Sequence, residues 1–238
     1  MGKAEKILFL NIVIVLFFRF SSFCQDYKQE IIKINKAYEN INGVVIDAKL
    51  QLYNSFTSTA PIEDQYLNIH RKGNNYIYRM GTSEIIRNDI YFLLVDKNNR
   101  VIVLDSASKQ HDEPQYLMLS RLDSTLGSYK KVQLTNINST TSRLIFTPGI
   151  ESVDRFEVLY NKNTYFIEKI IFFLHVNNES GSGVNEARVE ISYTRFSKNI
   201  SFPQNEFSVS RYIKLKGKNA VLLPAYADYK LYNNFIVD

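Results

Sequence analysis

Few side chains in this sequence are placed to do acid–base or metal chemistry. The three histidines, His70, His111 and His175, lie in different segments of the chain. The stretch "KQHDEPQ" sets His111 beside Asp112 and Glu113, and all three are metal-ligand types. Adjacent residues rarely converge on one ion, and nothing completes a coordination set, so we interpret the stretch as a solvated loop. The sequence predicts no metal site and no cofactor.

Nucleophilic catalysis has equally little support. Asp105-Ser106 and Asp123-Ser124 lack both a nucleophile elbow and a nearby histidine. Glu151 with Asp154 fits a turn better than an acid/base pair. The chain has no phosphate loop and no dinucleotide fingerprint. We therefore expect no catalytic residues and no enzyme activity, with a hydrolase as a distant third hypothesis behind two binding functions.

One cation stands out by its neighbours. "LNIHRKGNNYIYRM" (67–80) reads as two strands around a turn at 72–75, and strict alternation puts Leu67, Ile69 and Arg71 on one face. A charged group on an apolar face costs several kcal/mol unless it is paired. Arg71 therefore either reaches solvent at the strand end or closes a hollow space, and both alternatives stay open. His70 points to the other face, where a surface position is expected.

The N-terminus predicts export. A basic start is followed by an apolar run over 7–18, near a dozen residues against roughly 20 for a membrane span. Small residues then precede Gln25, so residues 1–24 are interpreted as a signal peptide cleaved after Cys24. The less favoured alternative makes Cys24 the lipid-modified first residue of a membrane-anchored lipoprotein. We expect a periplasmic protein.

Composition narrows the class further. The only cysteine lies in the signal, so the mature chain has neither a disulfide nor a thiolate site. Roughly 210 residues can bury one sizeable core, and residues 25–238 are predicted to form one domain. The formal net charge is +5, and the charged residues are interspersed along the chain without a basic block. Nucleic acid is therefore an unlikely partner.

The elements follow from periodicity. Apolar residues at helical spacing predict a helix over 27–41, and from Gly43 the period changes to two. Short strands separated by turn dipeptides predict successive antiparallel hairpins, interrupted by a second helix over 114–126. The predicted fold class is α+β: a curved antiparallel β-sheet, an open half-barrel, with one polar face and helices covering the concave apolar face. A sheet of this length must curl, and two modest helices leave room for a guest.

These segments together resemble a known family. "GVVIDAKLQLY", "IHRKGNNYIY" and "TPGIESVDRFEVLYNKNTYFIEKI" are similar to the patterns of the LolA/LolB/LppX superfamily of bacterial envelope lipid and lipoprotein carriers. Three features depart from it: Lys72 stands where the family has proline, the chain has no tryptophan, and a C-terminal extension (about 207–238) continues past the usual end. The abundance of Tyr, Phe, Asn and Lys resembles Bacteroidetes envelope proteins.

The resemblance implies a role for Arg71. In the carriers the matching arginine lies inside the half-barrel and hydrogen-bonds lid backbone, which holds the empty cavity closed. The cavity wall and lid that we predict for an apolar ligand are Val44, Ile46, Leu50, Leu52, Leu67, Ile69, Arg71, Tyr78, Leu119, Leu122, Val189 and Ile191.

Two functions remain open at this stage. The first is a non-enzymatic carrier or binder of lipid acyl chains or lipoproteins, expected to be a monomer. The second is an envelope interaction, scaffold or sensor module, in which the same half-barrel is filled by its own side chains and docks on an envelope membrane protein. An apolar cavity large enough for an alkyl chain would favour the first.

Overall fold

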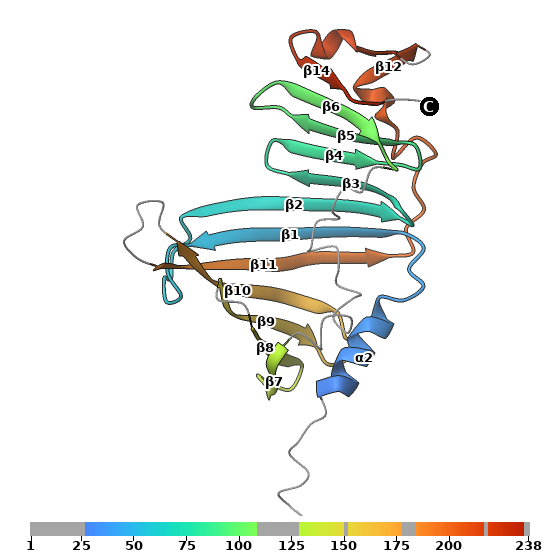
Figure 1. Cartoon of the computed structure of the whole chain (residues 1–238). Helices are drawn as coiled ribbons and strands as arrows, with labels where there is room; N and C mark the ends of the chain where they lie inside the picture. The colour runs from blue at the N-terminus through green and yellow to red at the C-terminus, as the bar shows by residue number, and fades with distance from the viewer. Residues whose placement is uncertain (1–26, 109–128, 150–151, 178–183, 217–218, 236–238) are drawn as a thin grey trace, which may run out of the picture.

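The computed structural model describes residues 27–108, 129–149, 152–177, 184–216 and 219–235. Within these ranges the chain forms one α-helix, two short 3₁₀ helices and fourteen strands (Figure 1). The elements are α2 (Tyr27–Ala37), β1 (Val44–Tyr53), β2 (Glu63–Lys72), β3 (Asn75–Met80), β4 (Ser83–Arg87), β5 (Tyr91–Asp96), β6 (Val101–Ser106), β7 (Tyr129–Asn136), β8 (Thr141–Pro148), β9 (Val153–Asn161), β10 (Ile167–Asn177), β11 (Val184–Lys198), η4 (Val209–Arg211), β12 (Ile213–Lys216), β13 (Asn219–Leu222), η5 (Pro224–Tyr226) and β14 (Lys230–Asn233).

Twelve strands make one curved sheet in the order β14-β6-β5-β4-β3-β2-β1-β11-β10-β9-β8-β7. The pairings are antiparallel except at one edge, where β14 runs parallel to β6. The sheet does not close, because β14 and β7 lie at its two ends (Figure 1). The predicted α+β open half-barrel is therefore confirmed. The parallel edge was not predicted, and β12 pairs with β13 in a separate small sheet.

The two faces of the sheet are defined by β1. Its residues Val44, Ile46 and Ala48 lie on the face that we call the inner face, together with Leu67 and Ile69 of β2. The intervening Asp47, Lys49 and Gln51 lie on the outer face, where Lys49 forms an ion pair with Asp64 at 2.8 Å. Because successive side chains alternate, this register fixes which residues of the neighbouring strands share the inner face.

Helix α2 packs on the inner face at the β8–β10 end of the sheet. Ile31 and Ile34 are fully buried against residues of β8, β9 and β10. The hydroxyl of Tyr160 on β9 donates to Glu30 at 2.6 Å, which ties the first turn of the helix to the sheet. The helix is four residues shorter than predicted, because the N–H of Tyr38 bonds to the carbonyl of Asn35 and tightens the end to a 3₁₀ turn.

The outer face is not polar throughout, which corrects the prediction of one polar face. At the β3–β6 end it carries a second buried cluster, formed by Ile77, Ile86, Leu93, Val95, Ile102 and Leu104. The segment predicted as a C-terminal extension covers this cluster with Phe207, Val209, Tyr212 and Ile213. In these strands the residues that face each side of the sheet are both apolar. The sequence pattern therefore predicted strands but did not predict a second layer that covers the outer face.

Several predictions lie outside the described residues. These are the signal peptide at 1–24 with Cys24, the loop with His111, and the helix over 114–126 with Leu119 and Leu122.

Candidate functional site

The inner face between β11 and β6 presents one continuous cross-strand row of apolar side chains and a shorter apolar row beside it. One cross-strand row runs through Phe196, Ile46, Ile69, Tyr78, Ile85, Leu94 and Val103. The next row includes Tyr193, Ala48, Leu67 and Met80. Side chains directly opposite each other in such rows are in contact range, so the rows form one surface.

Burial is graded along this surface. Ile69 and Ala48 are 1% exposed and Leu67 is 2% exposed. Leu50, Leu52 and Val189, towards the other end of the same strands, are only half-buried. Ile191 is buried and pairs with Leu50. The structure thus brings together the described apolar residues of the predicted wall on one face, and their role in binding a ligand stays a prediction.

Arg71 lies on the inner face, opposite Val44 in β1 and Tyr76 in β3. Its Nε donates to the carbonyl of Gly73 at 3.0 Å, within the β2–β3 turn. Gly73 has φ +58°, a left-handed conformation that suits glycine and leaves this carbonyl within reach of the guanidinium. This carbonyl belongs to the β2–β3 turn, so the contact with lid backbone and the role of closing a cavity stay predictions.

Sequence reasoning missed two inner-face cations, Arg87 and Lys198. Arg87 follows Ile85 by two residues in β4, and the alternation of "SEIIR" contained that signal. Lys198 was hidden, because β11 has an irregularity opposite Asp47 and Ala48 that inserts Thr194. After this bulge Phe196 and Lys198, rather than Arg195, share the face of Tyr193.

Two tyrosines meet where α2 approaches the sheet. The Tyr38 ring makes edge contacts with Phe166 and Phe196 at centroid distances of 5.5 and 5.2 Å, and its hydroxyl accepts from the N–H of Ile167 at 2.9 Å. The hydroxyl of Tyr193 is buried without a hydrogen-bond partner in the described part of the chain. Burial raises the pKa of both phenols, so both stay neutral at physiological pH.

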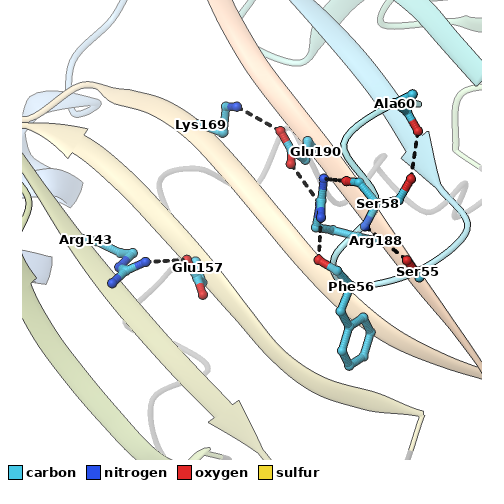
Figure 2. A network of polar contacts seen from close by, with 9 residues as sticks. All are labelled: Ser55, Phe56, Ser58, Ala60, Arg143, Glu157, Lys169, Arg188 and Glu190. Atoms are coloured by element: carbon cyan, nitrogen blue, oxygen red, sulfur yellow. Dashed lines mark hydrogen bonds and ion pairs between the residues drawn. The ribbon is translucent and has the colours of Figure 1, made fainter.

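The outer face over β8–β11 holds a network of ion pairs (Figure 2). Glu190, 9% exposed, lies between Lys169 at 2.8 Å and Arg188 at 2.9 Å. Arg188 also donates to the carbonyls of Phe56 and Ser58, which holds the β1–β2 loop against the sheet. Farther along, Glu157 pairs with Arg143 at 3.2 Å and with Arg155 at 3.1 Å.

These carboxylates do not form a catalytic pair. Each buried glutamate of the network has cationic partners, which is the arrangement that a structural ion pair requires. Asp154 pairs with Arg155, and Asp105 accepts from the N–H of Ser106. Among the described residues, no group of three or more His, Cys, Asp or Glu side chains is placed to hold a metal ion.

His70 is not the simple surface residue that was expected. Its Nδ1 lies 2.7 Å from Glu206 Oε1, and its ring stacks on Phe202 at 5.5 Å. These contacts join the outer face of β2 to the chain that leads into the C-terminal segment. The histidine therefore has a structural role. The same is true of the neighbouring salt bridges, in which Arg79 and Arg211 both contact the buried Glu84.

In the described part of the chain, two of the pockets open mainly among outer-face side chains. One of about 310 Å³ is lined by Asp47, Asn68 and Arg79, where Asn68 donates to Asp47 at 2.7 Å and accepts from Arg79 at 2.8 Å. The other, about 360 Å³, lies between Asn88 in the β4–β5 turn and the C-terminal segment. The polar groups of the first pocket hydrogen-bond to one another, so we interpret it as a surface groove between strands and not as a binding site. In the described part of the chain, no helix is long and apolar enough to span a membrane.

An open antiparallel sheet with a helix on its concave apolar face is the half-barrel architecture that the sequence resemblance implies. No protein-family model matches the chain, and no curated protein matches it. Similar solved structures include a LolA superfamily protein from Nitrosomonas europaea, at 12% identity over 77% of this chain and 96% of that chain, with a TM-score of 0.36. The lipoprotein LppX from Mycobacterium tuberculosis is similar at 10% identity over 74% and 97% of the two chains, with a TM-score of 0.40. LprF from Mycobacterium bovis is similar at 10% identity over 74% and 95%, with a TM-score of 0.42.

Proposed function

We propose that this protein is an exported, non-enzymatic binder or carrier of lipids or lipoprotein acyl chains. The inner face of the half-barrel is the binding surface in this proposal. Its location is the periplasm, reached through the N-terminal signal at 1–24 and cleavage after Cys24. The working unit in this proposal is a monomer, because both apolar rows of the inner face belong to one chain.

The observation that carries the proposal is the continuity of that surface. One apolar row extends from β11 across β1 to β6, and a second extends from β11 to β3. Farther along β1 and β11 the half-buried Leu50, Leu52 and Val189 continue the same face. An acyl chain that leaves water for such a surface gains about 0.8 kcal/mol per buried methylene, with no covalent chemistry. The buried Glu84, Glu157 and Glu190 lie on the outer face in ion pairs, which supports binding rather than catalysis.

The direct test is to identify what the protein holds. The mature chain (25–238) would be purified without detergent and extracted with organic solvent, and the extract would be analysed by mass spectrometry. Acyl lipids at stoichiometric amounts are the expected result. An empty extract, together with no uptake of a fluorescent fatty acid by the delipidated protein, would contradict the proposal.

Two neighbouring positions provide a matched pair of variants. Leu50 and Gln51 are consecutive, both are half-buried, and they face opposite sides of β1. Leu50→Asn places an amide in the proposed acyl surface and removes apolar area, so uptake should weaken by about tenfold or more. Gln51→Asn keeps an amide on the outer face, shortens the side chain by one methylene and should leave uptake unchanged. Equal effects of the two variants would argue against the inner face.

One observation favours a second function, that of an interaction module. The C-terminal segment builds its own core on the outer face and leaves Leu215, Val221 and Tyr232 exposed at 37%, 46% and 42%. In that reading the inner face is filled by the chain itself, and this segment contacts an envelope membrane protein. A delipidated protein that takes up no acyl probe, and whose binding to membranes rich in envelope proteins is lost on Val221→Asp, would favour it over the carrier.

A further inference from the structure

The strand register places three cations in one row of the inner face. Lys198 of β11 pairs with Val44 of β1, Val44 pairs with Arg71 of β2, Arg71 with Tyr76 of β3, and Tyr76 with Arg87 of β4. Because Cα partners across a ladder share a face, Lys198, Arg71 and Arg87 line the same edge of the apolar surface. We call these three residues the basic row. Neighbouring strands are roughly 4.8 Å apart, so the cations recur about every 10 Å.

The basic row is the last row before the strands end. Directly beside it lies the row of Phe196, Ile46, Ile69 and Tyr78, so charge gives way to apolar surface within one step along the strands. At the opposite end of the inner face the register positions include carboxylates, Glu63 of β2 and Asp96 of β5. The surface therefore has three cations at one end, in the row that Asp105 terminates, and the carboxylates Glu63 and Asp96 at the other.

Two members of the row are not neutralised within the described residues. Arg87 donates through Nη2 to the carbonyl of Ala107 at 3.3 Å. The Lys198 ammonium lies 5.3 Å from the centre of the Phe166 ring. Neither takes part in an ion pair there, whereas the outer-face arginines Arg79, Arg143 and Arg188 each have a glutamate. One carboxylate, Asp105, ends the row beyond Phe92, and it is buried and accepts from the N–H of Ser106.

We infer that the ligand of the inner face is a lipid with an anionic, phosphate-bearing headgroup, bound by the basic row while its acyl chains lie along the apolar rows. This inference rests on the proposed function and names its ligand class. An arginine presents planar paired donors to phosphate oxygens and a lysine presents a point charge, and both are suited to a phosphate at the edge of an apolar surface. A ligand in the reverse orientation would set its phosphate against Glu63 and Asp96.

The test compares lipids that share acyl chains and differ in headgroup. Delipidated mature protein would be titrated with fluorescent-tailed phosphatidylglycerol, phosphatidylcholine and diacylglycerol. Phosphatidylglycerol should bind about tenfold more tightly than diacylglycerol at low salt, because two or three partly exposed charge pairs are added. The preference should shrink at high salt, since ions screen exposed charges. Inorganic phosphate alone, without a chain in the apolar rows, should bind at least a hundredfold more weakly than phosphatidylglycerol.

Charge-matched variants assign the preference to the row. Arg87→Gln with Lys198→Gln should abolish the preference, so that phosphatidylglycerol binds no more tightly than diacylglycerol. Arg195→Gln with Lys214→Gln removes two exposed cations outside the row, so it lowers the net charge equally and should preserve the preference. Thermal melting would verify that both proteins fold; if the row variant unfolds, Arg87→Lys with Lys198→Arg, which keeps the charge, should retain the preference.

The outcomes separate the two proposals. Tight binding of all three lipids with no headgroup preference would overturn the basic row as a headgroup site and leave the acyl binder intact. Equal loss of preference in the row and control variants would overturn it in favour of a general effect of net charge. Inorganic phosphate binding as tightly as phosphatidylglycerol would replace the lipid headgroup with a free phosphate as the occupant. Binding of no lipid would refute both proposals.

Discussion

Removing one buried hydroxyl is expected to stabilise this protein. The hydroxyl of Tyr193 is buried with no hydrogen-bond partner among the described residues. Its ring packs against both inner-face clusters, the one around Ile31 and Ile34 and the one around Ile46 and Ile69. A buried polar group without a partner costs about 1–3 kcal/mol. Tyr193→Phe removes the oxygen and keeps the ring, and the small void that it leaves offsets part of the gain. The expected net effect is about 1 kcal/mol, which raises Tm by about 2–4 °C in a chain of this length.

The neighbouring Tyr38 provides the matched control. Its hydroxyl is also buried, but it accepts from the N–H of Ile167 at 2.9 Å. Tyr38→Phe is therefore chemically the same change with the opposite sign, because it leaves a backbone donor unpaired at a cost of about 1–3 kcal/mol. Both variants would be melted by calorimetry after delipidation, so that a bound ligand does not shift Tm. A fall in Tm for Tyr193→Phe as large as that for Tyr38→Phe would refute the reasoning.

Three further outcomes follow from the same structure. Burial raises the pKa of the Tyr38, Tyr160 and Tyr193 phenols above the ordinary value of about 10. Folded and unfolded chains are therefore equally protonated below pH 10, and above it the unfolded chain loses protons first. Chemical denaturation should then show the free energy of unfolding falling by up to about 1.4 kcal/mol per pH unit for each group. Arg188→Ala leaves Glu190 with only Lys169 as an ion-pair partner and releases the β1–β2 loop from the sheet. The free energy of unfolding should fall by about 3–5 kcal/mol, and amide hydrogen exchange over residues 54–62 should become faster. Exchange unchanged from wild type would show that other contacts hold the loop. Arg71→Leu should increase retention of an uncharged acylglycerol, because it adds apolar surface beside Val44, and equal retention in both proteins would reject a closing role for the arginine.

The sequence predicted the fold well where periodicity was strong. The change from period 3.6 to period 2 at Gly43 located α2 and β1, and Gly43 itself is required there, because a Cβ would lie 2.3 Å from the carbonyl oxygen of Ile200. Alternation in "GVVIDAKLQLY" assigned the inner and outer residues of β1 as the register has them. A strand with one wet face carries this information in its own residues, so no tertiary contact is needed to read it.

Two kinds of feature could not be read in this way. The bulge at Thr194 is a one-residue insertion relative to β1, and it is visible only once the partner strand is known; it moved Lys198 to the inner face. The pairing of His70 with Glu206 joins residues 136 positions apart, so neither local pattern contains it. Both features depend on which strands become neighbours, and periodicity does not encode that choice.

The two coverings that the structure describes lie on opposite faces and at opposite ends of the sheet. Helix α2 covers the inner face at β8–β10, and the C-terminal segment covers the outer face at β3–β6. Strands β3–β6 are therefore supported from behind by their own core, with Ile77, Ile86 and Leu93 fully buried there. This core is separate from the inner-face cluster that contains Tyr76 and Tyr78 of β3. In the carrier that we propose, a core on the outer side would help β3–β6 to stay folded while a ligand exchanges on the inner side, and a carrier has to release what it binds.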